Sequence, residues 1–285
     1  MAKSETLGKP TLVCRICPRH CALQEGQTGY CRARRCIDSK VTSLSYGIVT
    51  ALALDPIEKK PLYHFYPGSL ILSVGSFGCN MRCSFCQNHS IAQIGIEGAK
   101  EMETVPPKRL VETALAAKGK GNIGLAFTYN EPLVGYEYVL DSAKLATQAG
   151  LYNVLVTNGM VCQEPLRALL PYIHAMNIDL KSFREESYRS LGGDLETVKS
   201  AIATAAGVCH VEVTTLVVPG MNDSVEEIGD IAAWIGSLSR DIPFHISRFF
   251  PRWVMADREA TPVDTVYALA ETAKQHLQYV YTGNC

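Results

Sequence analysis

The chain has 285 residues and a formal net charge of -1, with 47% apolar and 19% charged residues. This apolar fraction is enough to bury a sizeable core, which excludes wholesale disorder. A net charge near zero gives no field for nonspecific binding to nucleic acid or membrane surfaces, and no apolar run approaches the roughly 20 residues of a membrane-spanning helix. Because the start of the chain also lacks the apolar segment of a signal peptide, we expect a soluble, cytoplasmic protein.

The sequence holds 11 cysteines, most of them in two groups. Without a secretory signal, grouped cysteines are typical of metal or iron–sulfur ligands rather than of disulfides. We expect the isolated Cys162 and Cys209 to be small buried hydrophobic residues. The first group is Cys14, Cys17, Cys21, Cys31 and Cys36, and the second is Cys79, Cys83 and Cys86.

Residues 1–40 are predicted to form a Cys-rich, metal-binding N-terminal module. They carry eight Lys or Arg against three acidic residues and show no helical or strand period. So short a segment cannot bury a core of its own, so we expect a metal to hold it together. The number of thiolates does not separate zinc from a second iron–sulfur cluster, and redox-active or unligated thiols are a third alternative. The candidate ligands are Cys14, Cys17, Cys21 and Cys31.

Residues 41–69 are predicted to contain a β-hairpin followed by a connection. The run from Val41 to Leu54 has β character on both sides of a Tyr46-Gly47 break. The Pro-punctuated string DPIEKKPLYHFYPG follows it. Several polar residues of this string fit a surface loop and the substrate side of a site equally well: Glu58, Lys59, Lys60, Tyr63 and His64.

Residues 70–285 are predicted to alternate strands with helices. Six apolar runs are short enough for buried parallel strands: Leu70–Val74, Ile123–Phe127, Leu151–Val156, Ala175–Leu180, Val211–Val218 and Ile242–Ile246. The helices between them include one opened by Pro106-Pro107, Val134–Ala149, Leu195–Ala206 capped by Asp194, Ser224–Leu238 capped by Asn222 or Asp223, and one opened by Thr261-Pro262. Six units in series predict an α/β fold, an open, partial (β/α)6 TIM-like barrel with right-handed crossovers.

Unusual polar residues follow each predicted strand directly. The carboxyl ends of parallel barrel strands form the active site in such folds, whatever the chemistry. The sequence therefore predicts one site built from these segments: the loop of Cys79, Cys83 and Cys86, then Tyr129-Asn130-Glu131-Pro132, Thr157-Asn158-Gly159, Asp179-Leu180-Lys181, Pro219–Asp223 and His245.

The second cysteine group has the spacing C-x3-C-x2-C. Three thiolates in one loop can hold three corners of a [4Fe–4S] cube and leave one iron open, and an open metal position is typical of catalysis. The alternative is a zinc site completed by His89, which would not explain the polar residues after the other strands.

With Phe85 before its third cysteine, this loop resembles that of the radical S-adenosylmethionine (SAM) superfamily, and the resemblance runs from Leu70 to about Val280. It implies that SAM binds the open iron and is reductively cleaved to a 5′-deoxyadenosyl radical, which abstracts a substrate hydrogen. The other motifs look like the branch of the pyruvate formate-lyase activating enzymes. This implies that Glu131 accepts a hydrogen bond from the SAM ammonium, and that the SAM-binding residues are Phe85, Asn130, Glu131, Asn158, Asp179, Lys181 and His245.

The chain departs from the activases at two places. It has Val156 where they usually place an acid before Thr-Asn-Gly, and residues 87–105 hold no cysteine for a ferredoxin-like insert. The opening cysteines, DPIEKKPLYHFYPGS and GCNMRCSFCQN resemble instead the radical SAM enzymes of the AmmeMemoRadiSam system. That resemblance implies an unidentified substrate, an electron donor such as a flavodoxin or ferredoxin, and Memo-like and AMMECR1-domain proteins as partners. The alternatives are a glycyl-radical activase and an iron–sulfur electron carrier without catalysis, which would need neither Glu131 nor Lys181.

Overall fold

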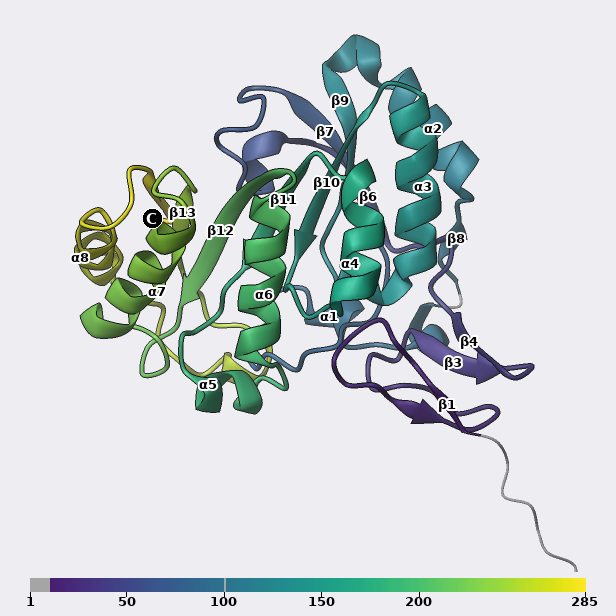
Figure 1. Cartoon of the computed structure of the whole chain (residues 1–285), viewed down its shortest axis with the longest axis horizontal. Coiled ribbons are helices and arrows are strands. Elements are labelled where there is room, and N and C mark those ends of the chain that lie inside the picture. Colours follow the sequence, from purple (N-terminus) through teal and green to yellow (C-terminus); the bar gives the residue numbers. More distant parts are fainter. Residues whose placement is uncertain (1–10, 100) are drawn as a thin grey trace, which may run out of the picture.

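The computed structural model describes residues 11–99 and 101–285, so the first ten residues of the predicted N-terminal module lie outside it. In the described chain the largest sheet has eight strands in the order β14-β13-β12-β11-β10-β9-β7-β6. All neighbours are parallel except β6 and β7, which pair antiparallel. This sheet confirms the predicted α/β fold with a partial TIM-like barrel (Figure 1).

The six predicted strands are present, each within two residues of its predicted bounds: β7 (Leu70–Gly75), β9 (Asn122–Phe127), β10 (Tyr152–Thr157), β11 (Ala175–Asp179), β12 (His210–Val217) and β13 (Phe244–Arg248). Their near-continuous burial explains why they read as short apolar runs. Two strands that the sequence analysis did not count extend the sheet at its edges, β14 (Val280–Gly283) and β6 (Ala51–Pro56).

The longer helices lie along the outside of the sheet: α2 (Pro107–Ala116), α3 (Tyr136–Gln148), α4 (Gln163–Leu169), α6 (Leu195–Ala206), α7 (Val225–Leu238) and α8 (Val263–Ala273) (Figure 1). The shorter ones are α1 (His89–Ala92) and α5 (Glu185–Ser190), with the 3-10 turns η1 (Ile57–Lys59), η2 (Ile96–Ala99), η3 (Lys118–Lys120), η4 (Pro132–Gly135), η5 (Leu170–Tyr172) and η6 (Trp253–Met255). No helix in the described part of the chain is long and apolar enough to cross a membrane.

Two helix caps test the predicted starts. Asp194 accepts a hydrogen bond from the backbone N–H of Thr197 and caps α6, as predicted. The cap of α7 is Ser224 rather than Asn222 or Asp223. The prediction failed there because Asn222 and Asp223 accept from the backbone N–H groups of the preceding loop instead, at 2.7 and 3.1 Å.

The predicted hairpin within residues 41–54 is wrong. Before the Tyr46-Gly47 break, β4 (Lys40–Ser43) pairs with β3 (Arg34–Ile37). After it, β5 (Ile48–Val49) pairs with β8 (Glu103–Thr104), and β6 pairs with β7 over six residues. The break turns the chain, but the edge of the large sheet offers a longer partner than a local hairpin could.

The N-terminal module has more strand than its sequence suggested, because its strands are too short to show a period. Besides β3 and β4 it contains the pair β1 (Leu12–Val13) and β2 (Ala22–Leu23). We call residues 11–43 the cap. Figure 1 shows its strands at the end of the barrel where α1 lies.

The connection between β6 and β7 fills the amino end of the barrel. Because β6 runs antiparallel to β7, this connection, residues 57–69 (the floor segment), lies where the parallel strands begin. Ile57 and Leu62 are fully buried and pack with residues of β7, β9, β10 and β11, namely Ile71, Ala126, Val154 and Ala175. Only the carboxyl end of the barrel is therefore left to form a site.

Candidate active site

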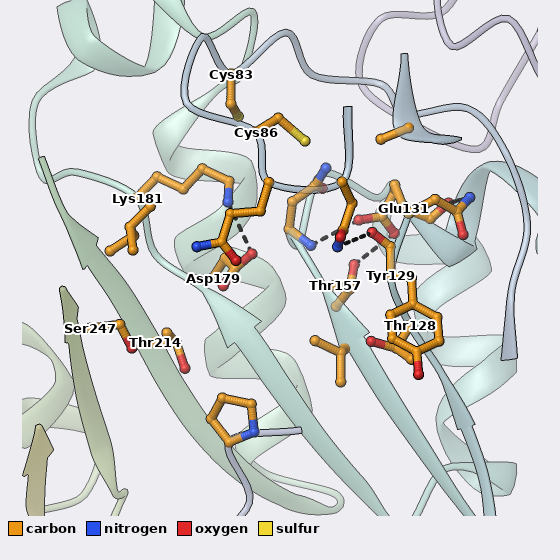
Figure 2. A pocket seen from close by; sticks show the side chains of 18 of the residues that line it. Cys83, Cys86, Thr128, Tyr129, Glu131, Thr157, Asp179, Lys181, Thr214 and Ser247 are labelled. Carbon is orange, nitrogen blue, oxygen red and sulfur yellow. Dashed lines mark hydrogen bonds and ion pairs between the residues drawn. The ribbon is translucent and has the colours of Figure 1, made fainter. Parts of the chain in front are cut away.

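The carboxyl ends of the parallel strands surround a cavity of about 520 Å³, within the ~300–1,000 Å³ range of small-molecule sites. Figure 2 shows Cys83 and Cys86 above it, Asp179 and Lys181 on one side and Glu131 on the other. Every residue predicted for the catalytic cluster or for SAM lines this cavity: Cys79, Cys83, Phe85, Cys86, Asn130, Glu131, Asn158, Asp179, Lys181 and His245. The structure brings these residues together, and their binding roles stay predictions.

The three cysteines of residues 76–88 (the cysteine loop) are largely shielded from water. Cys83 is buried, and Cys79 and Cys86 are partly exposed. Burial raises the pKa of all three thiols, to about 11 for Cys83. Lys181 opposes the rise at Cys83 and Cys86 and so favours their thiolates. A metal centre bound here would complete the deprotonation, because a coordinating thiol loses its proton.

Asn130 and a glycine fix the start of the cysteine loop. The Asn130 side chain accepts from the Ser76 N–H at 3.0 Å and donates to the carbonyl oxygens of Phe77 and Gly78 at 3.1 Å. Gly78 has φ +87°, and a Cβ atom there would lie 2.6 Å from the carbonyl oxygen of Cys31 in the cap. The Asn130 amide therefore supports the loop, and only glycine allows the close approach of the cap.

Glu131 is a buried carboxylate with room for one more donor. Its Oε1 accepts from the N–H of Leu133 at 3.0 Å and the hydroxyl of Thr157 at 2.8 Å. Its Oε2 accepts from the N–H of Asn158 at 2.8 Å. A carboxylate has about four lone-pair sites, so one stays open. Burial outweighs these bonds and raises the pKa of Glu131 to about 7, which means that a cation in the cavity would stabilise the ionised form.

Lys181 and Asp179 form an ion pair at 2.9 Å on the other side of the cavity. Burial alone would lower the pKa of Lys181, but the Asp179 carboxylate and the Cys83 thiolate outweigh it and raise the pKa above its usual value. The backbone N–H of Lys181 donates to the hydroxyl of the buried Tyr188 at 3.0 Å. Lys181 is therefore a fixed cation close to the cysteine loop.

His245 is tied to a residue that the sequence analysis did not single out. Its Nε2 lies 2.6 Å from Oε2 of Glu212, which is fully buried. Glu212 also accepts from the backbone N–H groups of Tyr63 and His64, at 3.0 and 2.8 Å. His245 thus has one ring nitrogen left for a ligand, and Glu212 joins it to the floor segment.

Tyr129, which follows a predicted strand, contacts Asp55, a residue that the sequence analysis did not single out. The Tyr129 hydroxyl donates to Oδ2 of Asp55 at 2.6 Å, and the buried Lys60 donates to the same atom at 2.9 Å. Tyr129 has φ 72°, uncommon for a bulky residue, and lines the cavity with Glu58, Lys59 and Tyr63 of the floor segment. The sequence feature that could have indicated Asp55 is a charged residue directly after the apolar run ALAL.

The four candidate metal ligands of the cap line a second, smaller cavity: Cys14, Cys17, Cys21 and Cys31. Cys36 is not among the residues that line it. Within residues 11–99 and 101–285, no three His, Cys, Asp or Glu side chains are arranged to hold a single metal ion. A metal in the cap stays a prediction.

The two isolated cysteines are less buried than predicted, although Cys209 packs against the main core. Cys162 and Cys209 are only partly buried, and the N–H of Cys162 donates to the carbonyl oxygen of Ile16 in the cap at 2.9 Å. Cys162 therefore belongs to the contact between barrel and cap rather than to the core. His89, the fourth ligand of the zinc alternative, stacks on Trp253 with ring centroids 5.5 Å apart.

A sequence model of the radical SAM superfamily matches residues 73–235, more than half of the chain. An uncharacterized protein of Methanocaldococcus jannaschii is 39% identical over 286 residues, covering 98% of this chain and 83% of that protein. The GTP 3',8-cyclase of Moorella thermoacetica is 29% identical, and the alignment covers 71% of this chain and 61% of the cyclase. The pyruvate formate-lyase 1-activating enzyme of Escherichia coli K12 is 26% identical, with coverages of 59% and 71%.

Solved structures resemble the chain in fold. Streptococcus suis SuiB aligns with a TM-score of 0.56 at 14% identity, over 75% of this chain and 51% of SuiB. QueE from Escherichia coli aligns with a TM-score of 0.50 at 12% identity, over 84% of this chain and 92% of QueE. The sequence model and the Methanocaldococcus relative carry the assignment: the chain belongs to the radical SAM superfamily.

Proposed function

We propose that this chain is a radical SAM enzyme of the AmmeMemoRadiSam type, which binds a [4Fe–4S] cluster at Cys79, Cys83 and Cys86 and SAM in the adjoining cavity. The bound cluster and SAM would supply reductive cleavage of SAM to a 5′-deoxyadenosyl radical, which abstracts hydrogen from the substrate. Members of the superfamily are enzymes that use these two groups. The substrate is unidentified.

One contact supports the proposal most directly: Asn158 links the thiol side of the cavity to Glu131. Its backbone N–H donates to Oε2 of Glu131 at 2.8 Å, and its side-chain Nδ2 lies 3.6 Å from Sγ of Cys79. The residue expected to hold the SAM ammonium and a residue expected to hold the cluster are therefore fixed relative to each other.

The donor set of the cavity fits both groups. Three thiols from one loop are soft ligands, and they would leave one iron without a protein ligand. Glu131 keeps an open lone-pair site for an ammonium group, and Lys181 is a cation suited to a carboxylate or a ribose hydroxyl. The contact of Asn158 with Cys79 would stabilise a thiolate, since hydrogen bonds to cluster sulfurs tune such centres.

The floor segment restricts the substrate. Because Ile57 and Leu62 of the floor segment pack against the strands at the amino end of the barrel, we do not expect a substrate to enter there. Tyr63 and Lys59 line the cavity from the floor segment, so they are candidates to contact the substrate.

Val156 supports the hypothesis of an AmmeMemoRadiSam enzyme over that of an activase. It lines the cavity at the position where the activases usually carry an acid, and its side chain has no group that could bind a cation. The similarity to the pyruvate formate-lyase 1-activating enzyme supports the second candidate, an activase that forms a glycyl radical on a partner protein.

The two candidates differ in a spectroscopic readout. The reduced, reconstituted protein should be incubated with SAM and a glycyl-radical enzyme from the same genome, and the paramagnetic resonance spectrum recorded. We expect no glycyl doublet. A stable doublet that requires intact Cys79, Cys83 and Cys86 would replace this proposal with the activase.

A further inference from the structure

The cap holds a group of thiols that the proposed reaction does not use. Cys14, Cys17 and Cys21 come from the β1–β2 turn, and Cys31 comes from the turn before β3; all four are free and line one cavity. The N–H of Cys14 donates to the carbonyl oxygen of Cys21 at 3.0 Å, so the two ends of the first turn meet. Two separate segments thus converge on one point.

The surroundings of this group suit an anionic centre. Arg34 lines the same cavity, its side chain is only 5% exposed, and it is held by Glu137 at 2.6 Å. A second guanidinium, that of Arg19, also lines the cavity. Cations beside thiols favour the thiolate form that binds metals.

The cap cysteines approach the catalytic cysteine loop through a pair of amide side chains. The Asn80 side chain lies close enough to the Cys17 thiol to oppose the rise in its pKa that burial causes. Its Oδ1 accepts from Nδ2 of Asn158 at 3.0 Å, and that same Nδ2 lies 3.6 Å from Sγ of Cys79. Two side chains joined by one hydrogen bond therefore separate Cys17 from Cys79.

The contact between the cap and the cysteine loop is rigidly built. Arg19 donates through Nε to the carbonyl oxygen of Asn80 at 2.9 Å and also bonds the carbonyl oxygen of Gly192. The guanidinium groups of Arg19 and Arg82 lie 3.5 and 3.9 Å from the ring centroid of Tyr30, and Arg82 donates to the Tyr30 carbonyl oxygen. The two cysteine groups are therefore held at a fixed separation.

We propose that Cys14, Cys17, Cys21 and Cys31 bind a second iron–sulfur cluster, which relays electrons to the cluster of the cysteine loop. Each thiolate would bind a different iron atom of this cluster. In the relay, a one-electron carrier of the flavodoxin or ferredoxin kind loses one electron, the cap cluster passes it on, and the catalytic cluster gains it. No bond or proton moves. The relay rests on the proposed function, whereas the binding of the cap cluster does not.

The binding is tested in the full chain with Cys79, Cys83 and Cys86 replaced by Ala. After anaerobic reconstitution with iron and sulfide, we expect about four irons per chain and a reducible cluster signal. Adding Cys17→Ala and Cys31→Ala together should remove both, because only two of the four thiolates then remain. Cys36→Ala is the matched control, because Cys36 is buried in the same cap but its thiol faces Glu25 at 3.8 Å; it should leave iron and signal unchanged.

Four results would overturn the binding: a folded triple variant without iron, zinc in place of iron, iron that survives the joint loss of Cys17 and Cys31, or equal iron loss with Cys36→Ala. Should a variant not fold, the unsubstituted protein decides. It should hold about eight irons and two cluster signals, of which SAM changes only one. About four irons with a single, SAM-responsive signal would contradict the proposal.

The relay is tested by the rate at which a pre-reduced flavodoxin reduces the catalytic cluster. The joint substitution Cys17→Ala and Cys31→Ala should slow this rate by about tenfold or more, and Cys36→Ala should not. An unchanged rate in the variant without Cys17 and Cys31 would overturn the relay. None of these readouts needs SAM cleavage, so failure of the proposed function, seen as a lack of 5′-deoxyadenosine, is told apart from failure of the second cluster.

Discussion

The backbone N–H of Asn158 donates a 2.8 Å hydrogen bond to the buried carboxylate of Glu131. Three such bonds hold this carboxylate, yet its pKa is raised to about 7 because it is withdrawn from water. Glu131 is thus close to the midpoint of its titration at neutral pH. Its charge becomes available when a cation arrives, which gives the proposed SAM site a pH dependence.

SAM affinity should rise with pH between 6 and 8, by roughly tenfold, because the ionised fraction of Glu131 rises by about that factor around a pKa of about 7. Its folded-state pKa lies above the ordinary 4.5. Glu131 therefore stabilises the ligand-free fold fully below pH 4.5, and this contribution is lost as the pH rises through about 7. SAM titration of the anaerobic protein at several pH values measures the effect.

Glu131→Gln is the matched variant, since it keeps the shape and removes the charge. Its SAM affinity should be weaker by about tenfold or more, equal to ~1.4 kcal/mol per decade, and should not change in this pH range through residue 131. Wild-type affinity with an unchanged pH profile in Glu131→Gln would show that Glu131 does not bind SAM.

The barrel could be predicted from sequence because each strand is largely buried on both faces and therefore appears as a short, mostly apolar run. The start of α6 could also be predicted, because the cap Asp194 binds the backbone N–H of Thr197, only three residues later in the chain. The hairpin prediction failed for the opposite reason. The partner of β6 is chosen by the edge of a sheet assembled from distant residues, and a local break at Tyr46-Gly47 carries no information about it.

Replacing Gly78 with Ala should destabilise the protein by about 2–4 kcal/mol, because the new Cβ would combine a left-handed backbone with a clash against the cap. The control is Gly26→Ala, which has a similar φ of +78° but nothing within 4 Å of its Cβ position. That variant should cost only about 1 kcal/mol. Urea unfolding measures the free energy of unfolding of both variants. Equal losses would mean that the close contact between the cap and the cysteine loop adds nothing to the cost at position 78.

Glu212→Gln should lower the free energy of unfolding at pH 7 by about 3 kcal/mol, at ~1.36 kcal/mol per pKa unit. Burial tends to raise the pKa of Glu212, but hydrogen bonds from His210, His245 and two backbone N–H groups outweigh it and lower the pKa from 4.5 to about 2. This contribution is fully present above pH 4.5 and is lost as the pH falls through about 2. The gap between wild type and variant should therefore be smaller at pH 3 than at pH 7.

The exposed Glu112 gives the comparison for this measurement. Its side chain is 60% exposed and lies 3.9 Å from Lys108, so Glu112→Gln should change stability by no more than about 0.5 kcal/mol. An effect of Glu212→Gln as small as that of Glu112→Gln would show that Glu212 does not hold the floor segment.

Only part of the candidate site could be predicted from the sequence. Residues that directly follow a strand, such as Glu131 and Lys181, could be grouped because parallel strands end at one edge. Glu212 could not, since it lies near the start of β12 and its partners Tyr63 and His64 precede it by 149 and 148 residues. In the sequence, such a long-range pair shows only as a charged residue inside an apolar strand, and this residue does not identify its partner.

The proposed chemistry is tested most directly by 5′-deoxyadenosine formed from SAM by the anaerobically reconstituted, reduced protein, measured by mass spectrometry. The account predicts that wild type forms this product and that Cys79→Ala, Cys83→Ala and Cys86→Ala do not, while Cys209→Ala, outside both cysteine groups, behaves as wild type. A wild-type protein with a full catalytic cluster that forms no 5′-deoxyadenosine, or a Cys83→Ala variant that forms it at the normal rate, would contradict the account.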